Sequence, residues 1–324
     1  MNRRIKVAFL GIMIGTNLFA FEKVGVTSFQ FLKVIPDARS TAMGEAYTSI
    51  ANGADGLYWN PAAMMRSHAL SINISQVDYI FDTKHFGTSI SYTFNRFALG
   101  FTFSGVDYGE IEVTDVNHLG FLPDGTYNPG VTGETIQPGA FVVGVGGAQR
   151  LTNKFTYGIN MKYVQEDMEV AQKSLLMWDM GILFETGFRT VTLSATIRNF
   201  GPQVEYFDYS YPLPQTMNIG ISSYLIGDNS PLLLKNDLLK LLVAFDLVQP
   251  RDYDQQYNIG LEYTFRNIMI LRAGYKINYD TEGLTLGTGL RLKGLGIDYS
   301  YCSYGKYLSA VHRFSLSFNR EIFD

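Results

Sequence analysis

The chain has 324 residues and a formal net charge of −4, and only 17% of its residues are charged, where about 25% is usual. Aromatic residues make up 14% of the chain, with 21 Tyr and 23 Phe. The sequence contains no basic cluster, which excludes a nucleic-acid-binding function. The only cysteine, Cys302, cannot form an internal disulfide and is interpreted as a small packing residue.

The first twenty residues predict a secretory signal peptide. Arg3, Arg4 and Lys6 form a basic region, residues 7–20 are apolar, and Ala20 is a small residue at a plausible cleavage point. A membrane-anchoring helix is the alternative. The apolar run is short for it, because a spanning helix needs about 20 apolar residues. We therefore predict that residues 1–20 direct export.

Residues 21–67 show no strand-like alternation and are rich in Ala and Gly. Residues 37–50 form a modest helix candidate, and Asn60-Pro61 is typical of a helix cap followed by proline at the first helical position. We predict that residues 21–67 form a hatch inside a barrel rather than a disordered tail, because the segment is dense in large apolar side chains. The residues assigned to the hatch site are Asp55, Tyr58, Trp59, Asn60 and Pro61.

From His68 onward the dominant period is two, as in "FTYGINMKY" (155–163), where large apolar and small polar residues alternate. Successive side chains of a strand point to opposite faces, so this pattern predicts amphipathic strands. About fourteen strands follow from it. Their expected ranges are 68–77, 84–94, 96–106, 139–151, 154–166, 174–186, 190–200, 214–226, 239–249, 254–266, 268–279, 284–293, 295–303 and 310–320.

Three features favour a membrane barrel over a soluble β-sandwich. Many expected strands have ten or more residues, where soluble strands average about 5–6. Tyr and Phe lie near both ends of the apolar face, as in interface girdles. The other face is rich in Gly, Ser, Thr and Asn and carries isolated charges predicted to face the lumen: Asp179, Glu185, Glu262, Arg272, Lys276, Arg291 and Asp298. The predicted fold is all-β: an antiparallel outer-membrane barrel of about 14 strands over residues 68–324, surrounded by outer-membrane lipid.

The connections alternate between short and long, as in outer-membrane barrels with short periplasmic turns. Residues 95–96, 152–154, 187–190, 266–267 and 293–294 form the short turns, and residues 107–138, 167–173 and 200–213 form the long outer loops. The connection 227–238 is long where a short turn is expected, so either a short helix caps that end or the strand count slips there. The loop 107–138 is the leading candidate for ligand entry or partner docking. The alternative is a solvated loop folded over the barrel mouth.

No catalytic set is evident, and we predict that the protein is not an enzyme. His68, His85, His118 and His312 lie in no recognisable triad or metal-ligand spacing. The "GVGG" stretch (144–147) lacks the lysine and helix of a phosphate loop. No catalytic, cofactor-binding or metal-binding residue is assigned. The lumen charges either form a polar track or pair with one another, and pairing is favoured.

Two stretches carry a resemblance to a known family. "ARSTAMGEAYTSIANGADGLYWNPAAM" (38–64) resembles the N-terminal signature of the PorV/PorQ family and its wider FadL-like relatives. "RNFGPQVEYFDYSYPLPQTMNIGISSYL" (198–225) resembles a PorV/PorQ landmark. The resemblance implies a fourteen-stranded FadL-like barrel with an N-terminal hatch in the bacterial outer membrane.

The same resemblance implies three alternative functions. The first is admission of small hydrophobic solutes, such as long-chain fatty acids, past the hatch. The second is a PorV-like role in type IX secretion, with the translocon and exported cargo as partners. The third is a purely structural barrel. The chain looks compact, without an extended surface-loop module for cargo capture, and this leaves the choice between the branches open.

Overall fold

The computed structural model describes residues 25–320, except 68, 170, 207, 306 and 307. The predicted signal peptide and His68 lie outside these residues. Within the described ranges, no helix combines the length and apolar character needed to cross a membrane.

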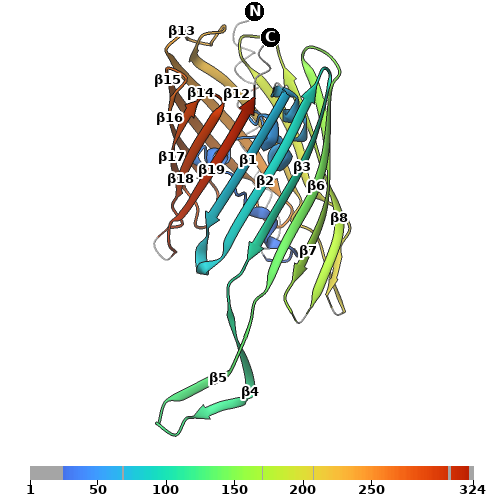
Figure 1. The fold of residues 1–324 in the computed structure, drawn as a ribbon, viewed down its shortest axis with the longest axis vertical. Helices are drawn as coiled ribbons and strands as arrows, with labels where there is room; N and C mark the ends of the chain where they lie inside the picture. The colour runs from blue at the N-terminus through green and yellow to red at the C-terminus, as the bar shows by residue number, and fades with distance from the viewer. Residues whose placement is uncertain (1–24, 68, 170, 207, 306–307, 321–324) are drawn as a thin grey trace, which may run out of the picture.

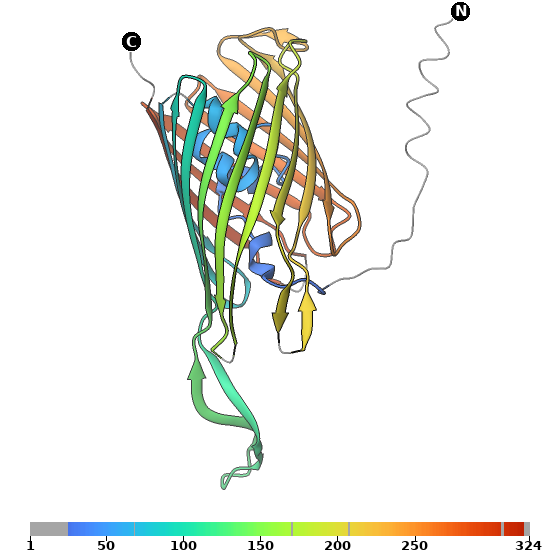
Figure 2. The same ribbon diagram turned by 90° about the vertical axis from the view of Figure 1, so that its right-hand side faces the viewer.

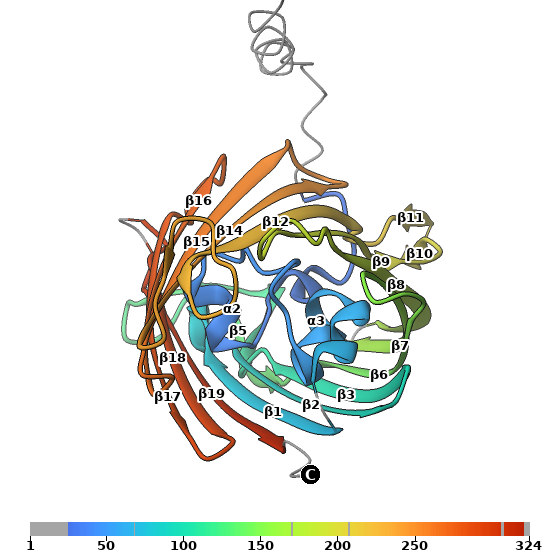
Figure 3. The same cartoon turned by 90° about the horizontal axis from the view of Figure 1, so that it is seen from above.

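Fourteen antiparallel strands close into a barrel (Figures 1 and 3). Each pairs with its neighbours in chain order, β19 pairs with β1, and the pairing of β9 with β12 continues the ring past a small outer ribbon. The predicted fold class and strand number are confirmed. The barrel strands are β1 (Ala69–Asp78), β2 (Lys84–Phe94), β3 (Phe97–Asp107), β6 (Gly139–Arg150), β7 (Phe155–Asp167), β8 (Gln172–Glu185), β9 (Thr192–Phe200), β12 (Thr216–Gly227), β14 (Leu239–Pro250), β15 (Gln256–Phe265), β16 (Met269–Ile277), β17 (Leu284–Leu292), β18 (Leu295–Cys302) and β19 (Val311–Arg320).

Side chains alternate between an exposed apolar outer face and a buried inner face. In β7, Tyr157, Ile159 and Met161 lie exposed on the outside, whereas Asn160 and Lys162 are buried inside. A closed ring leaves no barrel strand edge unpaired, which is the condition for crossing lipid with strands. The apolar outer band and the closed ring together identify an outer-membrane β-barrel.

The two ends of the barrel differ in their connections. One end carries tight turns such as Asn95-Arg96, where Asn95 has a positive φ of 54°. The other carries the longer loops, including η4 (Ile80–Asp82) and the ribbon β10 (Val204–Tyr206) and β11 (Tyr209–Tyr211). We assign the tight-turn end to the periplasm and the other end to the outside.

The long connection 227–238 is neither a helix nor a sign of a slipped strand count. Strand β12 continues past the end of β9, whose pairing stops at Thr192 opposite Ser222. The two-residue strand β13 (Leu234–Lys235) then pairs in parallel with Ile226 and Gly227. The connection is long because the β12–β14 hairpin rises above the periplasmic rim.

The loop 107–138 differs from the expectation of a compact chain. It forms a second sheet, β4 (Ile111–Phe121) and β5 (Tyr127–Ile136), which projects away from the outer end of the barrel (Figures 1 and 2). The expected absence of an extended surface module is therefore wrong, and the alternative in which this loop folds over the mouth is also wrong. The ribbon continues from β3 and β6, whose pairing ends at Asp107 opposite Gly139.

Residues 25–67, here called the lumenal segment, lie inside the ring of strands (Figure 3). They run from the outer end toward the periplasmic end, where β1 begins (Figure 2). The expected helix over 37–50 is only partly present, because Gly44 and Glu45 both adopt a left-handed φ of 62° and end it. The elements are η1 (Gln30–Lys33), α2 (Ala38–Ala42), η2 (Gly53–Asp55), α3 (Gly56–Trp59) and η3 (Pro61–Arg66).

Candidate functional site

Asn60 joins the lumenal segment to the barrel wall. Its Oδ1 accepts a hydrogen bond from Ala62 N at 3.1 Å, which caps η3, and Pro61 occupies the first position of that helix. Its Nδ2 donates to the carbonyl oxygens of Thr48 and Ile182, both at 3.1 Å. Asn60 is fully buried. The Asn-Pro step therefore shapes the local turn and also fastens it to β8.

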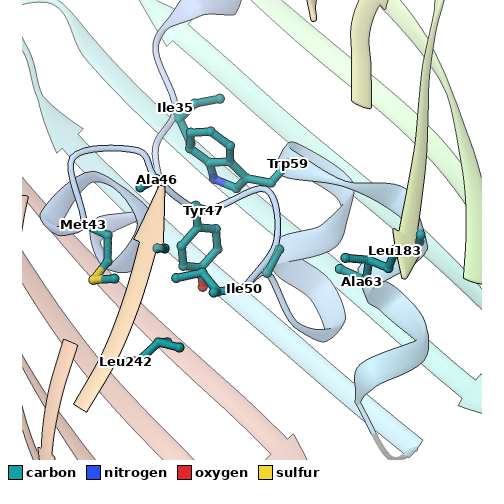
Figure 4. Packing of buried hydrophobic residues seen from close by; sticks show 12 residues of the cluster. Ile35, Met43, Ala46, Tyr47, Ile50, Trp59, Ala63, Leu183 and Leu242 are labelled. Atoms are coloured by element: carbon teal, nitrogen blue, oxygen red, sulfur yellow. The ribbon is translucent and has the colours of Figure 1, made fainter. Parts of the chain in front are cut away.

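Trp59 belongs to the main buried cluster, where it lies beside Ile35 and Tyr47 (Figure 4). Its ring meets Tyr47 edge-to-face, with 5.8 Å between centroids, and the Arg198 guanidinium of β9 lies 4.7 Å from the Trp59 ring centroid. Leu183, Leu242 and Ala244 contribute wall side chains to the cluster. The lumen is thus filled by a packed apolar core at this level.

Asp55 lies in a buried polar group beside that core. It accepts hydrogen bonds from Tyr47 Oη at 2.9 Å and from Asn73 Nδ2 at 2.8 Å. The same Asn73 amide lies 3.3 Å from Asp37, whose other oxygen caps α2. Burial and the neighbouring Asp37 carboxylate raise the pKa of Asp55 to about 7. Tyr58, the remaining residue of the predicted hatch site, lines an inner cavity described below.

Five charged residues form a continuous chain from α2 into the wall. Arg39 binds Glu262 through two bonds of 2.9 and 3.0 Å, and Arg272 bridges Glu262 and Asp298, at 2.7 Å each. Arg291 completes the chain through Asp298 at 2.9 Å. Four of the seven predicted lumen charges thus belong to one network, which Arg39 ties to the lumenal segment.

The other predicted lumen charges lie elsewhere. Asp179 pairs with Lys162 at 2.8 Å. Lys276 pairs with Glu45 at 2.7 Å and also with Glu282. Glu185 is exposed at the periplasmic end of β8 and joins neither group.

Asp246 and Arg198 are the residues that the sequence reasoning missed. Asp246 in β14 accepts hydrogen bonds from Tyr47 N at 3.1 Å and Thr48 N at 2.9 Å, so it anchors the turn after α2. It is the only charge in "LLVAFDLV" (241–248) and falls on the inward face with Ala244. Such a charge inside an apolar strand was the available signal.

Wall glycines make room for the lumenal segment. A Cβ added at Gly158 of β7 would lie 2.5 Å from Ala62 N and Pro61 C. One added at Gly260 would lie 2.5 Å from the carbonyl oxygen of Met43, and one at Gly146 would lie 2.6 Å from Leu57. The backbone of the segment therefore rests directly on the sheet.

Two cavities lie toward the outer end of the lumen. The outer one has a volume of about 510 Å³ and is lined by η1, by aromatic residues of the long loops such as Tyr79 and Tyr279, and by Arg198. The inner one, of about 50 Å³, is lined by Pro36, Leu57 and Tyr58 among others. The residues that line both are Phe31, Leu32, Val34, His85, Arg198 and Asn199. A cavity of 300–1,000 Å³ is typical of small-molecule sites, so only the outer one has room for a solute.

Polar donors line the boundary between these cavities. Arg198 donates to the carbonyl oxygen of Tyr58 at 3.4 Å, its Nε has no hydrogen-bond partner within the described residues, and it belongs to none of their ion pairs. His85 packs edge-to-face on Tyr79 at 5.4 Å. No group of three or more His, Cys, Asp or Glu side chains in the described part of the chain is placed to hold a metal ion.

Comparison with known proteins identifies related folds. No protein-family model matches the chain, and no curated protein matches it. Among solved structures, the CymD monoaromatic hydrocarbon channel has a TM-score of 0.55 and 13% identity, over 93% of this chain and 99% of that one. The Pseudomonas putida toluene transporter TodX has a TM-score of 0.53 and 13% identity, over 86% and 95%. At this level of identity the comparison shows the fold alone, and the chain shares the barrel fold of this channel and this transporter.

Proposed function

We propose that this barrel admits small hydrophobic solutes through the outer membrane, with the lumenal segment acting as the hatch. The outer cavity carries the proposal, because part of its lining is the lumenal segment itself, at Phe31, Leu32 and Val34. A solute in the cavity would touch the element that blocks its way. The similarity to a hydrocarbon channel and a toluene transporter supports the same class of solute.

The hatch would have to shift for a solute to pass. The cavity beyond η1 has a volume of only about 50 Å³, and the main core around Trp59 closes the lumen behind it. Because protein interiors are close-packed, this core leaves no path for a molecule larger than a few waters. For the solute to pass, contacts between the hatch and the barrel wall must therefore break, and contacts between the solute and the wall must replace them.

Uptake of radiolabelled toluene and of a labelled long-chain fatty acid by cells that make the protein tests the proposal. Leu32→Asp places a carboxylate in the cavity lining, and we expect a several-fold loss of uptake of both solutes. Val26→Asp is the matched control, since Val26 is exposed in the same segment and lines neither cavity. Equal uptake by the two variants, with both barrels folded, would contradict the proposal.

Arg198 supports a finer proposal, that the solute carries a carboxylate, as a long-chain fatty acid does. Arg198 lines both cavities, and its buried Nε has no hydrogen-bond partner within the described residues. A carboxylate on a guanidinium forms charge-assisted hydrogen bonds, which a neutral hydrocarbon cannot form. Arg198→Met should reduce fatty-acid uptake and leave toluene uptake unchanged. Equal loss of both would indicate a structural role for Arg198.

A PorV-like role in type IX secretion is the second candidate, and the projecting β4–β5 ribbon favours it over a purely structural barrel. A component that contacts a translocon or exported cargo needs a surface beyond the membrane, and this ribbon is such a surface (Figure 2). Stable co-purification with a very large barrel or exported cargo domains, without bound lipid, would support secretion. Co-purified fatty acid without such partners would support transport.

A further inference from the structure

The β4–β5 ribbon stands apart from the barrel in its hydrogen bonding. Its two strands pair only with each other, beginning at Ile111 opposite Ile136. Its root is held in place, because Tyr108 Oη donates to Glu166 at 2.8 Å and Gln137 N donates to Glu169 at 2.8 Å. The ribbon is therefore anchored at its base and free of the barrel along its length (Figures 1 and 2).

Large apolar side chains are exposed along this ribbon. Phe121 is 79% exposed and Val116 is 78% exposed, and the Phe121 ring meets Tyr127 edge-to-face with 5.4 Å between centroids. Leu119 and Leu122 are exposed beside them. An isolated two-stranded ribbon has no core and is marginally stable in water. Apolar residues that gather on such an element indicate a contact surface.

The charge of the ribbon is of one sign. Residues 107–138 contain six carboxylates and neither Lys nor Arg. The six are Asp107, Glu110, Glu112, Asp115, Asp124 and Glu134. Like charges repel, so this composition opposes an anionic lipid surface and also the same ribbon of a second copy. A basic protein surface is the complementary partner.

The ribbon is poorly suited to binding by strand addition. Its pairing shifts between Glu112 and Thr114 and again between Thr114 and Leu119. Gly130 and Gly133 adopt positive φ values of 99° and 86°, and Pro129, which precedes Gly130, has no N–H to donate. Irregular edges of this kind discourage the addition of another strand. Recognition therefore falls to the side chains.

We propose that the tip of the β4–β5 ribbon, centred on Phe121 and Tyr127, binds an extracellular protein that presents Lys or Arg around an apolar pocket. The aromatic pair enters the pocket and supplies most of the binding energy, as buried aromatic anchors do at interfaces. The surrounding carboxylates steer the approach and select basic partners. This surface goes beyond solute admission and acts independently of the hatch.

A photo-crosslinking amino acid placed at Phe121 of the full-length protein in its native cells tests the surface. The same group at Phe81 is the matched control, because Phe81 is 77% exposed in another outer loop. We expect a protein adduct at 121 and not at 81, with the cross-linked peptide carrying Lys or Arg. A lipid adduct, a dimer of this chain, equal adducts at both positions or no adduct would overturn the proposal.

A binding measurement separates the two parts of the surface. The purified protein in nanodiscs is titrated with a synthetic Lys/Leu peptide and with the same peptide carrying Glu in place of Lys. Both Phe121→Ser and the neutralised variant Glu110→Gln/Glu112→Gln/Asp115→Asn/Asp124→Asn should weaken binding of the Lys/Leu peptide at least tenfold. If the neutralised variant lost peptide binding and Phe121→Ser kept it, the binding would be unspecific charge attraction, and the proposal would be overturned. Solute uptake should be unchanged in every ribbon variant, because the ribbon acts independently of the hatch. A failure of the uptake proposal and a failure of the surface proposal can therefore be told apart.

Discussion

Single wall residues decide how closely the lumenal segment can approach the barrel. At Gly158 the backbone of Pro61 and Ala62 occupies the space of a side chain. We expect Gly158→Ala to destabilise the seated segment by about 1–3 kcal/mol, the usual range for overpacking. Urea unfolding followed by Trp59 fluorescence measures this, after Trp178→Phe removes the second of the two tryptophans.

Gly147→Ala is the matched control for this prediction. It makes the same change in the neighbouring strand, but the added Cβ meets only Leu99 at 3.9 Å. An ordinary van der Waals contact should change the free energy of unfolding by less than about 0.5 kcal/mol. Equal effects at Gly147 and Gly158 would show that the measurement reports strand propensity and not the close contact between the lumenal segment and the wall.

Asp55 predicts a pH dependence for the seated segment. Burial beside Asp37 raises the pKa of Asp55 to about 7, from an ordinary value of 3.8. Between about pH 4 and 7 the folded state therefore holds a proton that the unfolded chain has lost, and stability falls as pH rises through this window. The slope from one such group is at most about 1.4 kcal/mol per pH unit.

The measurement is the urea midpoint of Trp59 fluorescence at several pH values between 4 and 8. Asp55→Asn mimics the protonated carboxyl and should flatten the dependence, while Asn73 and Tyr47 keep hydrogen-bonding partners. An unchanged slope in this variant would assign the pH dependence to other groups.

At the scale of elements, the charge network joins α2 to the four consecutive strands β15, β16, β17 and β18. Glu262 lies between Arg39 and Arg272; it is the carboxylate that Arg39 binds and one of the two that Arg272 binds. Glu262→Gln removes the carboxylate that Arg39 binds and leaves Arg272 with Asp298 alone. Breaking a buried pair in this way costs about 3–5 kcal/mol. Asp228→Asn is the control, because the Asp228–Lys240 pair is partly exposed and should contribute less than about 1 kcal/mol. Chemical denaturation of the two variants compares them directly.

The strands were predictable because period-two alternation persists through every barrel strand. Lipid outside and a polar lumen inside impose the same alternation on each, so even β2 has its predicted bounds of 84–94. The β4–β5 ribbon broke that rule, since both its faces are solvated and no alternation was required of it. The sequence therefore predicts a loop over residues 107–138, where the structure has two strands.

The contents of the lumen were less predictable than its wall. The cap at Asn60 could be inferred because the Asn-Pro step is a local signal. The partners of Glu262 and Asp246 in the lumenal segment could not be inferred, because Arg39 of α2 and Thr48 of the turn after it lie about 200 residues away in sequence. The sequence also does not show which wall glycines contact the lumenal segment, because this depends on where the segment lies inside the barrel.

At the scale of the whole molecule, the barrel closes without help from the lumenal segment. All fourteen strands take their ladder partners from one another, and the junction of β9 with β12 continues the ring. The segment instead fills the lumen with apolar core around Tyr47 and Trp59 and supplies Arg39 to the buried charges. The strand pairing of the wall thus does not depend on the lumenal segment, although packing and charge couple the two.

Deleting residues 38–66 should therefore leave a folded but open barrel. The ladder hydrogen bonds stay within the wall, and the exposed inner face, with residues such as Asn160, Asp179 and Arg272, is polar enough to hold water. We expect ion conductance in a planar bilayer, where the intact protein conducts little, and a gel mobility that still changes on boiling. A folded barrel that stays closed to ions would mean that the wall itself collapses inward. In that case the lumenal segment would hold the pore open rather than seal it.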